Sequence, residues 1–367
     1  MPRSKIIGSQ GNLGRRNLVI NGAMKISQRG TTGTTPTTDN YLLDRFALSR
    51  FGGYPDNSTQ TQESDAPTGH YKSFKMVRNS AHTLTGTNAS AFLQRIEGQN
   101  MAHLNWGSST AKSCTISFWV KSNQTGDFPL ILADSPNAFD IGKLYTINSA
   151  NTWEHKKIKI EAPTAGTFNT NNTAAVTVYW GFGAVDAART AQGTTWGSSN
   201  NSGSSKSMVT GASTALATTS GATWQITGVQ MEIGDATDFE HRIFAEELLL
   251  CQRYYSEQFP PSGTGVTNGT TGVARINVPL AVQMRTAPTI SISGTIYVYS
   301  GTHASSVSAL DQTWATPDKV EWDATTAGTI QNNGGQGLAV YNETASNGTI
   351  NVAKSESGGG LKFNAEL

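Results

Sequence analysis

The chain has 367 residues, a length that suggests two or three domains. Charged residues make up only 14% of it and the formal net charge is +1, so the sequence lacks the basic stripe typical of nucleic-acid binders. It has no apolar run near the ~20 residues of a membrane span, and its start lacks the apolar core of a signal peptide. We therefore predict no nucleic-acid partner and no membrane insertion.

The rest of the composition favours an all-β protein. Thr favours strands, while Ser, Asn and the 38 glycines favour turns. The 8 Trp, 10 Tyr and 13 Phe supply more apolar surface than a disordered chain carries. Both cysteines, Cys114 and Cys251, lie in apolar segments, so we interpret them as small buried residues rather than a disulfide.

The N-terminal part begins with a polar segment and continues with short β elements. Residues 1–16 have no periodicity and are expected to be an arm that attaches to a neighbouring protein, with Arg15 and Arg16 as candidate contacts. Residues 17–28 predict a hairpin with its turn at Asn21-Gly22. Residues 41–49 predict a strand in which Asp44 and Arg45 pair locally, and residues 52–70 a polar loop.

Six later segments have the apolar content or alternation of strands. They cover residues 71–77, 91–96, 114–120, 153–160, 174–181 and 222–232. Strands at this spacing, separated by turn signals, indicate an antiparallel sandwich. Three tryptophans within these strands are expected in its core: Trp119, Trp180 and Trp224. The Gly/Ser/Thr/Ala-rich residues 183–220 form a loop long enough to be functional or mobile.

A helix is predicted after the last of these strands. Its apolar residues follow a 4-3-4-4 spacing: Phe244, Leu248, Cys251, Tyr255 and Phe259. Pro260-Pro261 ends it. Neighbouring leucines and Tyr254 widen the apolar surface, so the helix needs burial on two sides. One side can be the sandwich, and the other a second domain or another copy of the chain. The five spaced residues are therefore candidate contacts between copies.

A second β pattern begins after a Gly/Thr-rich linker and predicts a small antiparallel β-domain. The predicted organisation is an attachment arm at 1–16, a β-sandwich at 17–240, a helix and connector at 241–261, and a C-terminal β-domain at 262–367.

Signals for catalysis and for metal binding are weak. Glu246 and Glu247 diverge on the helix, so they cannot form the facing carboxylate pair of a glycoside hydrolase. Glu232 and Asp235 flank a turn, and we interpret them as a turn cap or as partners of Arg242, with a calcium site as the alternative. The six histidines lack metal-ligand spacing, and His241 is expected to be a hydrogen-bonded junction residue. No cofactor and no enzymatic activity are predicted.

Sugar binding needs an exposed aromatic ring with amide or carboxyl groups nearby. Trp106 in NWGSS, Trp196 in TTWGSSNNS and Trp314 in DQTWATPD lie in segments of that composition, predicted to be loops. Each is a candidate for glycan binding, and each could instead be a packing anchor.

Several segments, in this order, resemble a family of bacteriophage tail-fibre and related virion proteins. They are NLVINGAMKISQRGT with DNYLLDRF, LTGTNASAFLQRIEGQNMAHLNWGSSTAKSCTISFWVKSNQTG, YTINSANTWEHKKIKI, ATWQITGVQMEIGDATDFEHRIFAEELLLCQRYY and VPLAVQMRTAPTISISG. The SFWVKS, Trp153 and GVQMEIG strands are also similar to jelly-roll carbohydrate-binding modules. The resemblance covers nearly the whole chain.

This resemblance implies a virion component with a jelly-roll core, a homotrimer exposed to host-surface glycan. It would be a tail-fibre or receptor-binding subunit held in the virion through residues 1–16 or an adaptor. The alternative is a head fibre, collar piece or adaptor without a glycan role. A polysaccharide depolymerase is a third hypothesis.

Overall fold

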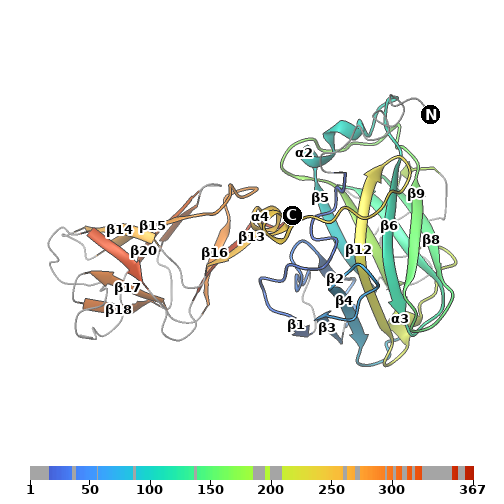
Figure 1. Ribbon diagram of the computed structural model, residues 1–367, viewed down its shortest axis with the longest axis horizontal. Coiled ribbons are helices and arrows are strands. Elements are labelled where there is room, and N and C mark those ends of the chain that lie inside the picture. Colours follow the sequence, from blue (N-terminus) through green and yellow to red (C-terminus); the bar gives the residue numbers. More distant parts are fainter. Residues whose placement is uncertain are drawn as a thin grey trace. The chain divides into compact units, whose positions relative to one another are not determined.

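The structure is a computed structural model of the chain (Figure 1). It describes residues 16–34, 39–55, 57–85, 88–135, 139–184, 195–198, 209–258, 263–268, 273–293, 296–300, 303–307, 312–315, 319–324, 349–353 and 360–367. Apart from Arg16, the predicted arm therefore lies outside the described residues. The chain forms two compact units, Met1–Glu247 together with Leu367, and Leu248–Glu366.

The first unit is an antiparallel jelly-roll β-sandwich, which confirms the predicted fold class (Figure 1). Within the described residues it has two six-stranded sheets. The first sheet contains, in spatial order, β1 (Thr32–Thr34), β3 (Ser58–Glu63), β4 (Ser73–Arg78), β12 (Thr223–Ile233), β6 (Cys114–Ser122) and β9 (Glu154–Ile160). The second contains β11 (Gly197–Ser198), β8 (Phe139–Ile147), β7 (Gly126–Asp134), β10 (Ala174–Ala184), β5 (Ala89–Glu97) and β2 (Ala47–Phe51).

The core lies between the two sheets. In β6 the alternation holds, because Ile116, Phe118 and Val120 are fully buried. Trp180 and Trp224 are also in the core, as predicted, and the Phe92 ring lies 5.5 Å from that of Trp224. The prediction for Trp119 is wrong: it is half-buried on the other face of β6, as the alternation requires.

Two strands, β7 and β8, were not predicted. Residues 128–134 in β7 are buried without alternation, a pattern typical of a strand covered on both faces. Pro129 further weakens the strand signal in the sequence. Its position explains why it is tolerated, because Leu130 is the last β7 residue that pairs with β10.

The predicted hairpin at 17–28 is wrong. This segment forms no strand and lies against β12, where Leu18 N donates to Met231 O and Val229 N donates to Gly22 O, both at 2.9 Å. Asn21 has the positive φ (62°) expected of a turn residue, but the turn serves docking rather than a hairpin. A side chain at position 22 would place its Cβ 2.0 Å from Val229 O, so only glycine permits this approach.

The next two predictions also need correction. Residues 41–46 precede β2 rather than belonging to it, because Arg45 adopts a positive φ of 71°. Asp44 accepts a hydrogen bond from Gln28 N and lies 3.6 Å from the Arg29 guanidinium. The predicted loop at 52–70 contains β3, whose hydrophilic sequence STQTQE gave no apolar signal.

A buried polar junction joins the N-terminal segment to the residues after β12. The Arg242 guanidinium donates to Asn17 O, and to Val19 O at 3.1 Å, and forms ion pairs with Glu240 (3.3 Å) and Glu247 (3.2 Å). Glu247 also accepts from Asn21 N at 2.5 Å. We call this group the Arg242 junction.

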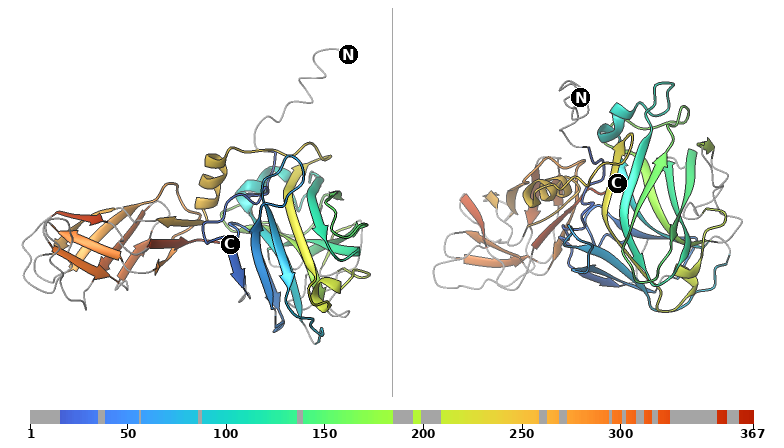
Figure 2. Two further views of the ribbon diagram at one scale, coloured as in Figure 1. Left: turned by 60° about the horizontal axis from the view of Figure 1, so that its bottom comes forward. Right: turned by 45° about the vertical axis from the view of Figure 1, so that its right-hand side comes forward.

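Short helices occupy the two ends of the sandwich. The α-helix α2 (Gly98–Met101) and the 3-10 helix η1 (Ala102–Leu104) follow β5 at one end, and α3 (Ala215–Thr218) lies at the other (Figure 2). In the predicted loop 183–220, the described residues contain β11 and α3.

The helix α4 (Phe244–Gln252) is shorter than predicted. Tyr255 begins β13 (Tyr255–Gln258), because its backbone pairs with Asn364 instead of continuing the helix. Phe259 lies outside the described residues. Cys251 and Tyr255 are buried and Leu248 is half-buried, whereas Phe244 is exposed. No described helix is long and apolar enough to cross a membrane.

The second unit is also antiparallel β, as predicted. In the described ranges, a three-stranded sheet contains β13, β22 (Gly360–Asn364) and β16 (Thr289–Ser293). A seven-stranded sheet contains β18 (His303–Val307), β17 (Ile296–Ser300), β21 (Thr349–Ala353), β14 (Gly263–Asn268), β15 (Val273–Pro279), β20 (Lys319–Ala324) and β19 (Gln312–Ala315). Both cysteines of the chain are free and buried, which confirms that prediction.

Candidate functional site

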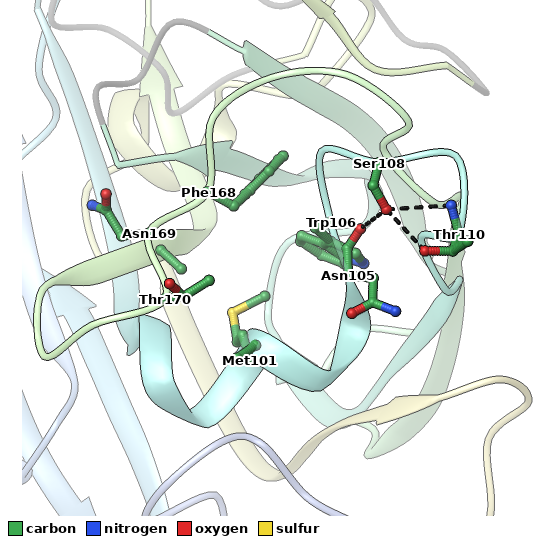
Figure 3. Close-up of a pocket in the computed structure, with 10 residues that line it drawn as sticks. Met101, Asn105, Trp106, Ser108, Thr110, Phe168, Asn169 and Thr170 are labelled. Carbon is green, nitrogen blue, oxygen red and sulfur yellow. Dashed lines mark hydrogen bonds between the residues drawn. The ribbon is translucent and has the colours of Figure 1, made fainter.

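A cavity of about 310 Å³ lies at the α2 end of the sandwich, between η1 with its following loop and the loop that joins β9 to β10. Ten residues line it: Met101, Ala102, Asn105, Trp106, Ser108, Thr110, Phe168, Asn169, Thr170 and Ala175. Figure 3 shows Met101 at the lower edge of this group, with Thr170 to its left, Asn105 to its right and Phe168 above it. This is the candidate functional site.

The backbone after η1 turns Trp106 toward the second loop. Asn105 ends η1 in the left-handed conformation (φ 54°), and Gly107 has φ 86°. Gly107 N donates to Pro163 O at 2.9 Å, and a Cβ at position 107 would lie 2.8 Å from Gly166 O. The two loops are therefore held together by a contact that requires glycine.

Two of the predicted glycan-binding residues meet beside the cavity. The rings of Trp106 and Trp196 lie 5.3 Å apart and meet edge to face. Phe168 lies 5.3 Å from Trp106 and 5.6 Å from Trp196, and Phe139 stacks on Trp196 at 6.0 Å. We call these four side chains the aromatic cluster. The sequence did not single out the two phenylalanines: Phe139 begins β8, which was not predicted, and Phe168 lies in the loop between β9 and β10.

Both indole N–H groups in the cluster donate to the protein itself. Trp106 Nε1 donates to Lys112 O at 2.8 Å, and Trp196 Nε1 donates to Glu161 O at 2.7 Å. These bonds fix the rings in place but leave no indole donor for a ligand. Both rings also pack against the sandwich core. Trp106 and Trp196 therefore serve as packing anchors, and a ligand would meet Trp106, which lines the cavity, through its ring surface.

The polar side chains that line the cavity divide into two kinds. Ser108 and Thr110 bond to each other at 3.0 Å, and Asn169 Nδ2 donates to Ala174 O at 2.8 Å. In contrast, no hydrogen bond from any described residue reaches the side chains of Asn105 and Thr170, which are exposed. Their amide and hydroxyl groups can therefore bind the hydroxyls of a ligand.

The lining of the cavity is uncharged, since it contains no Asp, Glu, Lys, Arg or His. His103 lies nearby in η1, where burial and the Lys112 ammonium lower its pKa below the ordinary value. Lys112 Nζ itself donates to His103 O at 2.9 Å. Because the lining has no carboxyl group, the cavity lacks the paired acids of most glycoside hydrolases.

Other predicted site residues lie elsewhere. Trp314 is in strand β19 rather than a loop, and its side chain lies outside the described part of the structure. Arg15 is also outside the described residues. Arg16 is bound within its own unit, since its guanidinium donates to Thr237 Oγ1 at 2.6 Å and to Asp238 O at 3.4 Å.

The predicted pair Glu232 and Asp235 have separate partners. Glu232 is buried and accepts from Gln230 Nε2, Thr237 N and Thr237 Oγ1, each at 2.7 Å, so it caps the turn after β12. The Asp235 side chain is 92% exposed and lies 3.4 Å from Lys159 Nζ. No group of three or more potential metal ligands occurs among the described residues. Arg242, a predicted partner of the pair, instead forms ion pairs with Glu240 and Glu247.

Comparisons with known proteins gave structural neighbours only. No protein-family model matches the chain, and no curated protein matches it. One similar solved structure is the enzymatically active domain of tailspike protein 4 of bacteriophage CBA120, with 16% identity and a TM-score of 0.31. The match covers 60% of this chain and 22% of that one, so the chain spans about a fifth of the tailspike structure.

Two carbohydrate-binding modules are also similar in structure. The family 11 module of a Clostridium thermocellum cellulosomal cellulase has 11% identity and a TM-score of 0.27, with 58% of this chain and 100% of that one covered. The CBM22-1 xylan-binding domain from Paenibacillus barcinonensis has 9% identity and a TM-score of 0.27, with 60% and 96% covered.

Proposed function

We propose that this chain is a structural protein of a phage virion, a homotrimeric tail-fibre or receptor-binding subunit whose sandwich presents a cavity to host-surface glycan. Several segments resemble those of phage fibre proteins and follow one another in the same order, and this resemblance supports the virion assignment. One observation carries the glycan role: an aromatic cluster adjoins a cavity in which the Asn105 and Thr170 side chains have no partner among the described residues. Glycan sites combine ring surfaces with a few such polar groups.

The cavity favours a neutral part of a glycan. Its side chains offer an amide, hydroxyls and ring surfaces but no charge. The proposed role is binding without catalysis, because the lining has no carboxyl group. An assay for reducing ends released from host capsule tests this directly, and release would establish the depolymerase hypothesis instead.

The glycan role is tested with Asn105→Gly on an array of bacterial surface polysaccharides, followed by titration calorimetry. Glycine keeps the positive φ of position 105 and removes only the amide side chain. We expect binding by the natural chain and affinity lower by about fivefold in the variant, the value of one lost hydrogen bond. The matched control is Asn151→Gly, another exposed asparagine with positive φ (58°), which should leave affinity unchanged.

The internal hydrogen bonds of both indoles favour a second candidate, a head fibre, collar or adaptor without a glycan role. In that case Trp106 and Trp196 only hold two loops together. Trp196→Ala would then lower the unfolding temperature, and neither the natural chain nor Asn105→Gly would bind any glycan on the array.

Exposed apolar residues around α4 support the proposed trimer. Ile243 is 71% exposed, Phe244 60% and Leu249 45%. Large exposed apolar side chains can mark a contact between proteins. Light scattering should give three times the chain mass at micromolar concentration, and the double variant Ile243→Ser with Phe244→Ser should lower it. A monomeric natural chain would contradict the trimer.

A further inference from the structure

The outer face of the first sheet carries a second set of aromatic and polar side chains. Unlike the lining of the cavity, this set includes charged groups. Strand pairing places Thr227, Trp119 and His155 in one row across β12, β6 and β9. The next row contains Gln225 and Lys121, with Trp153 just before β9. On the other side, Ser117 and Lys157 form a third row. These positions alternate with the core residues of β6 and so lie on the opposite face. Ser117, Gln225 and Thr227 are nevertheless buried, so the accessible side chains of the face are Trp119, Lys121, Trp153, His155 and Lys157.

The aromatic side chains on this face are held in place but remain open to solvent. Trp119 stacks on His155 at 4.9 Å with the planes 22° apart. Trp119 and Trp153 are half-buried and His155 is exposed. Tyr71, beside this face, is 74% exposed, with Lys25 Nζ 5.8 Å from its ring centre. Ring surface of this kind can contact the apolar face of a sugar.

Asp65 fixes the polar side chains of the second row. Its carboxylate accepts from Lys121 Nζ at 2.6 Å, Trp153 Nε1 at 3.2 Å and Gln225 Nε2 at 3.3 Å. The hydrogen bond from Lys121 is the main cause that lowers the pKa of Asp65. Lys121 Nζ also lies 5.8 Å from the Trp153 ring centre. One carboxylate thus positions a cation, an amide and an indole together.

The charge on this face is positive. Five lysines lie on it or at its edge, Lys25, Lys72, Lys75, Lys121 and Lys157, against the carboxylates Glu63 and Asp65. Lys75 pairs with Glu63 at 3.6 Å and Lys121 with Asp65. Lys72 donates only to Ser64 Oγ, and Lys157 has no ion pair among the described residues. The excess cations also lower the pKa of neighbouring histidines, Lys25 that of His241 and Lys157 that of His155, in each case after burial.

We propose that this face, defined by Asp65, Trp119, Lys121, Trp153, His155, Lys157 and Gln225, is a second binding surface and takes an acidic polysaccharide. Sugar rings lie against the aromatic side chains, and Lys157 binds a carboxylate of the glycan. Gln225 and Thr227 are buried and support the face through hydrogen bonds to Asp65 and to Lys72 O. Charge complementarity is the reason for the acidic class. The surface is independent of the neutral cavity at the α2 end.

The test is calorimetric titration of the full chain with oligogalacturonate, polysialate and hyaluronate, and with neutral dextran as the uncharged probe. We expect at least one acidic glycan to bind and dextran to bind more weakly at this face. Affinity for the acidic glycan should fall as the salt concentration rises from about 0.05 to about 0.3 M, a range over which the Debye length shortens roughly twofold. Silence of all three acidic glycans, or binding that salt does not weaken, would overturn the proposal.

Two substitutions on one strand give a matched comparison. Lys157→Gln should lower affinity for the acidic glycan by about fivefold, the effect of one exposed charge contact. Lys159→Gln removes the same charge two residues further along β9, where the lysine is paired with Asp235, and should have little effect. Equal losses in the two variants would mean non-specific charge attraction and contradict a defined surface.

The cavity and the outer face can fail separately. Asn105→Gly should leave acidic-glycan binding unchanged, while Lys157→Gln should leave neutral-glycan binding unchanged. Trp153→Ala should lower acidic-glycan affinity by about tenfold, since it removes both ring surface and the cation–π partner of Lys121. The unfolding temperature of each variant is measured as well, and an unchanged value shows that the substitution altered binding rather than stability. If Asn105→Gly removed acidic-glycan binding, the outer face would not be the site.

Discussion

The Arg242 junction and the cavity beside Trp106 both depend on asparagine, but they use it in opposite ways. In the junction, Asn21 Nδ2 donates to Ile26 O and Asp44 O, and its Oδ1 accepts from Ile26 N. At the cavity, no hydrogen bond from a described residue reaches the Asn105 side chain. A polar side chain whose partners are all internal stabilises the fold, whereas one facing a concave aromatic surface without partners can bind a ligand.

The junction also shows how distant parts of the first unit depend on each other. Arg242 and Glu247 follow the last strand of the sandwich, yet they hold residues near the N-terminal end of the described chain. Two of the segments that carry the family resemblance therefore meet in one structural feature. In contrast, the cavity is formed by loops, where a substitution can change binding without unfolding the sandwich.

The largest effect should come from removing the guanidinium of the junction. Arg242→Met leaves the buried Glu247 carboxylate and the carbonyls of Asn17 and Val19 without this donor. We expect a loss of about 3–5 kcal/mol in the free energy of unfolding, measured by urea denaturation. Arg50→Met, at a half-buried position on β2, should change it by no more than about 0.5 kcal/mol. Equal effects would mean that the junction does not stabilise the unit.

The next effect concerns the close approach of the N-terminal segment to β12. Gly22→Ala forces a methyl group to within 2.0 Å of Val229 O unless the backbone moves. The expected cost is about 1–3 kcal/mol, typical of overpacking. Gly197→Ala is the matched control, because a Cβ there meets nothing within 4 Å. A stable Gly22→Ala protein would show that the N-terminal segment can shift without loss.

The sequence predicted the strands best where apolar and polar residue types alternate. β6 and β12 alternate, or carry apolar residues at regular intervals, and both were found. β7 was missed because both of its faces are covered, so its pattern is continuous rather than alternating. The hairpin predicted around Asn21 was wrong for another reason: the turn chemistry was real, but tertiary hydrogen bonds to β12 replaced the strand ladder.

The candidate site could be predicted only in part. The composition around Trp106 and Trp196 marked both as loop tryptophans, but their contact joins residues 90 positions apart and depends on how two loops pack. The same limit applies to the outer face. Trp119 was expected in the core, although the alternation of β6 puts it on the other face, and its pairing with His155 requires the register of β9. Residue type indicates what chemistry is possible, and the register decides which groups meet.

A smaller effect concerns the dependence of the free energy of unfolding on pH. Burial, and next the charges of His241 and Lys25, lower the pKa of His70 from 6.5 to about 4. Below pH 6.5 the unfolded chain binds a proton that the folded chain does not, so stability should fall as the pH decreases from 6.5 toward 4. Above 6.5 this group contributes no pH dependence. The free energy of unfolding, measured by urea denaturation between pH 7 and 4.5, should therefore depend less on pH in His70→Gln.

The control for this effect is His103→Gln. His103 is exposed, and its pKa is lowered in the same direction by burial and Lys112. Its removal should flatten the pH dependence less than removal of the half-buried His70. The pKa of the Glu154 carboxylate is lowered to about 2, so its contribution to stability is lost mainly at lower pH. It does not affect the comparison between His70→Gln and His103→Gln. An unchanged slope in His70→Gln would mean that the folded and unfolded chains bind this proton equally, so that the fold does not lower the pKa of His70.

The smallest effect on stability should be at the cavity itself. Thr170→Val replaces a hydroxyl without a described partner by a methyl group of similar shape, so the free energy of unfolding should change by no more than about 0.5 kcal/mol. Neutral-glycan affinity should nevertheless fall by about fivefold, because the buried hydroxyl of the sugar loses its partner. The control is Thr83→Val. Thr83 is exposed and lies at the α3 end of the sandwich, where the neighbouring His82 N donates to Ala217 O. This substitution should change neither quantity. If Thr170→Val destabilised the fold and left binding intact, the distinction between satisfied and unpartnered polar groups would not hold at this cavity.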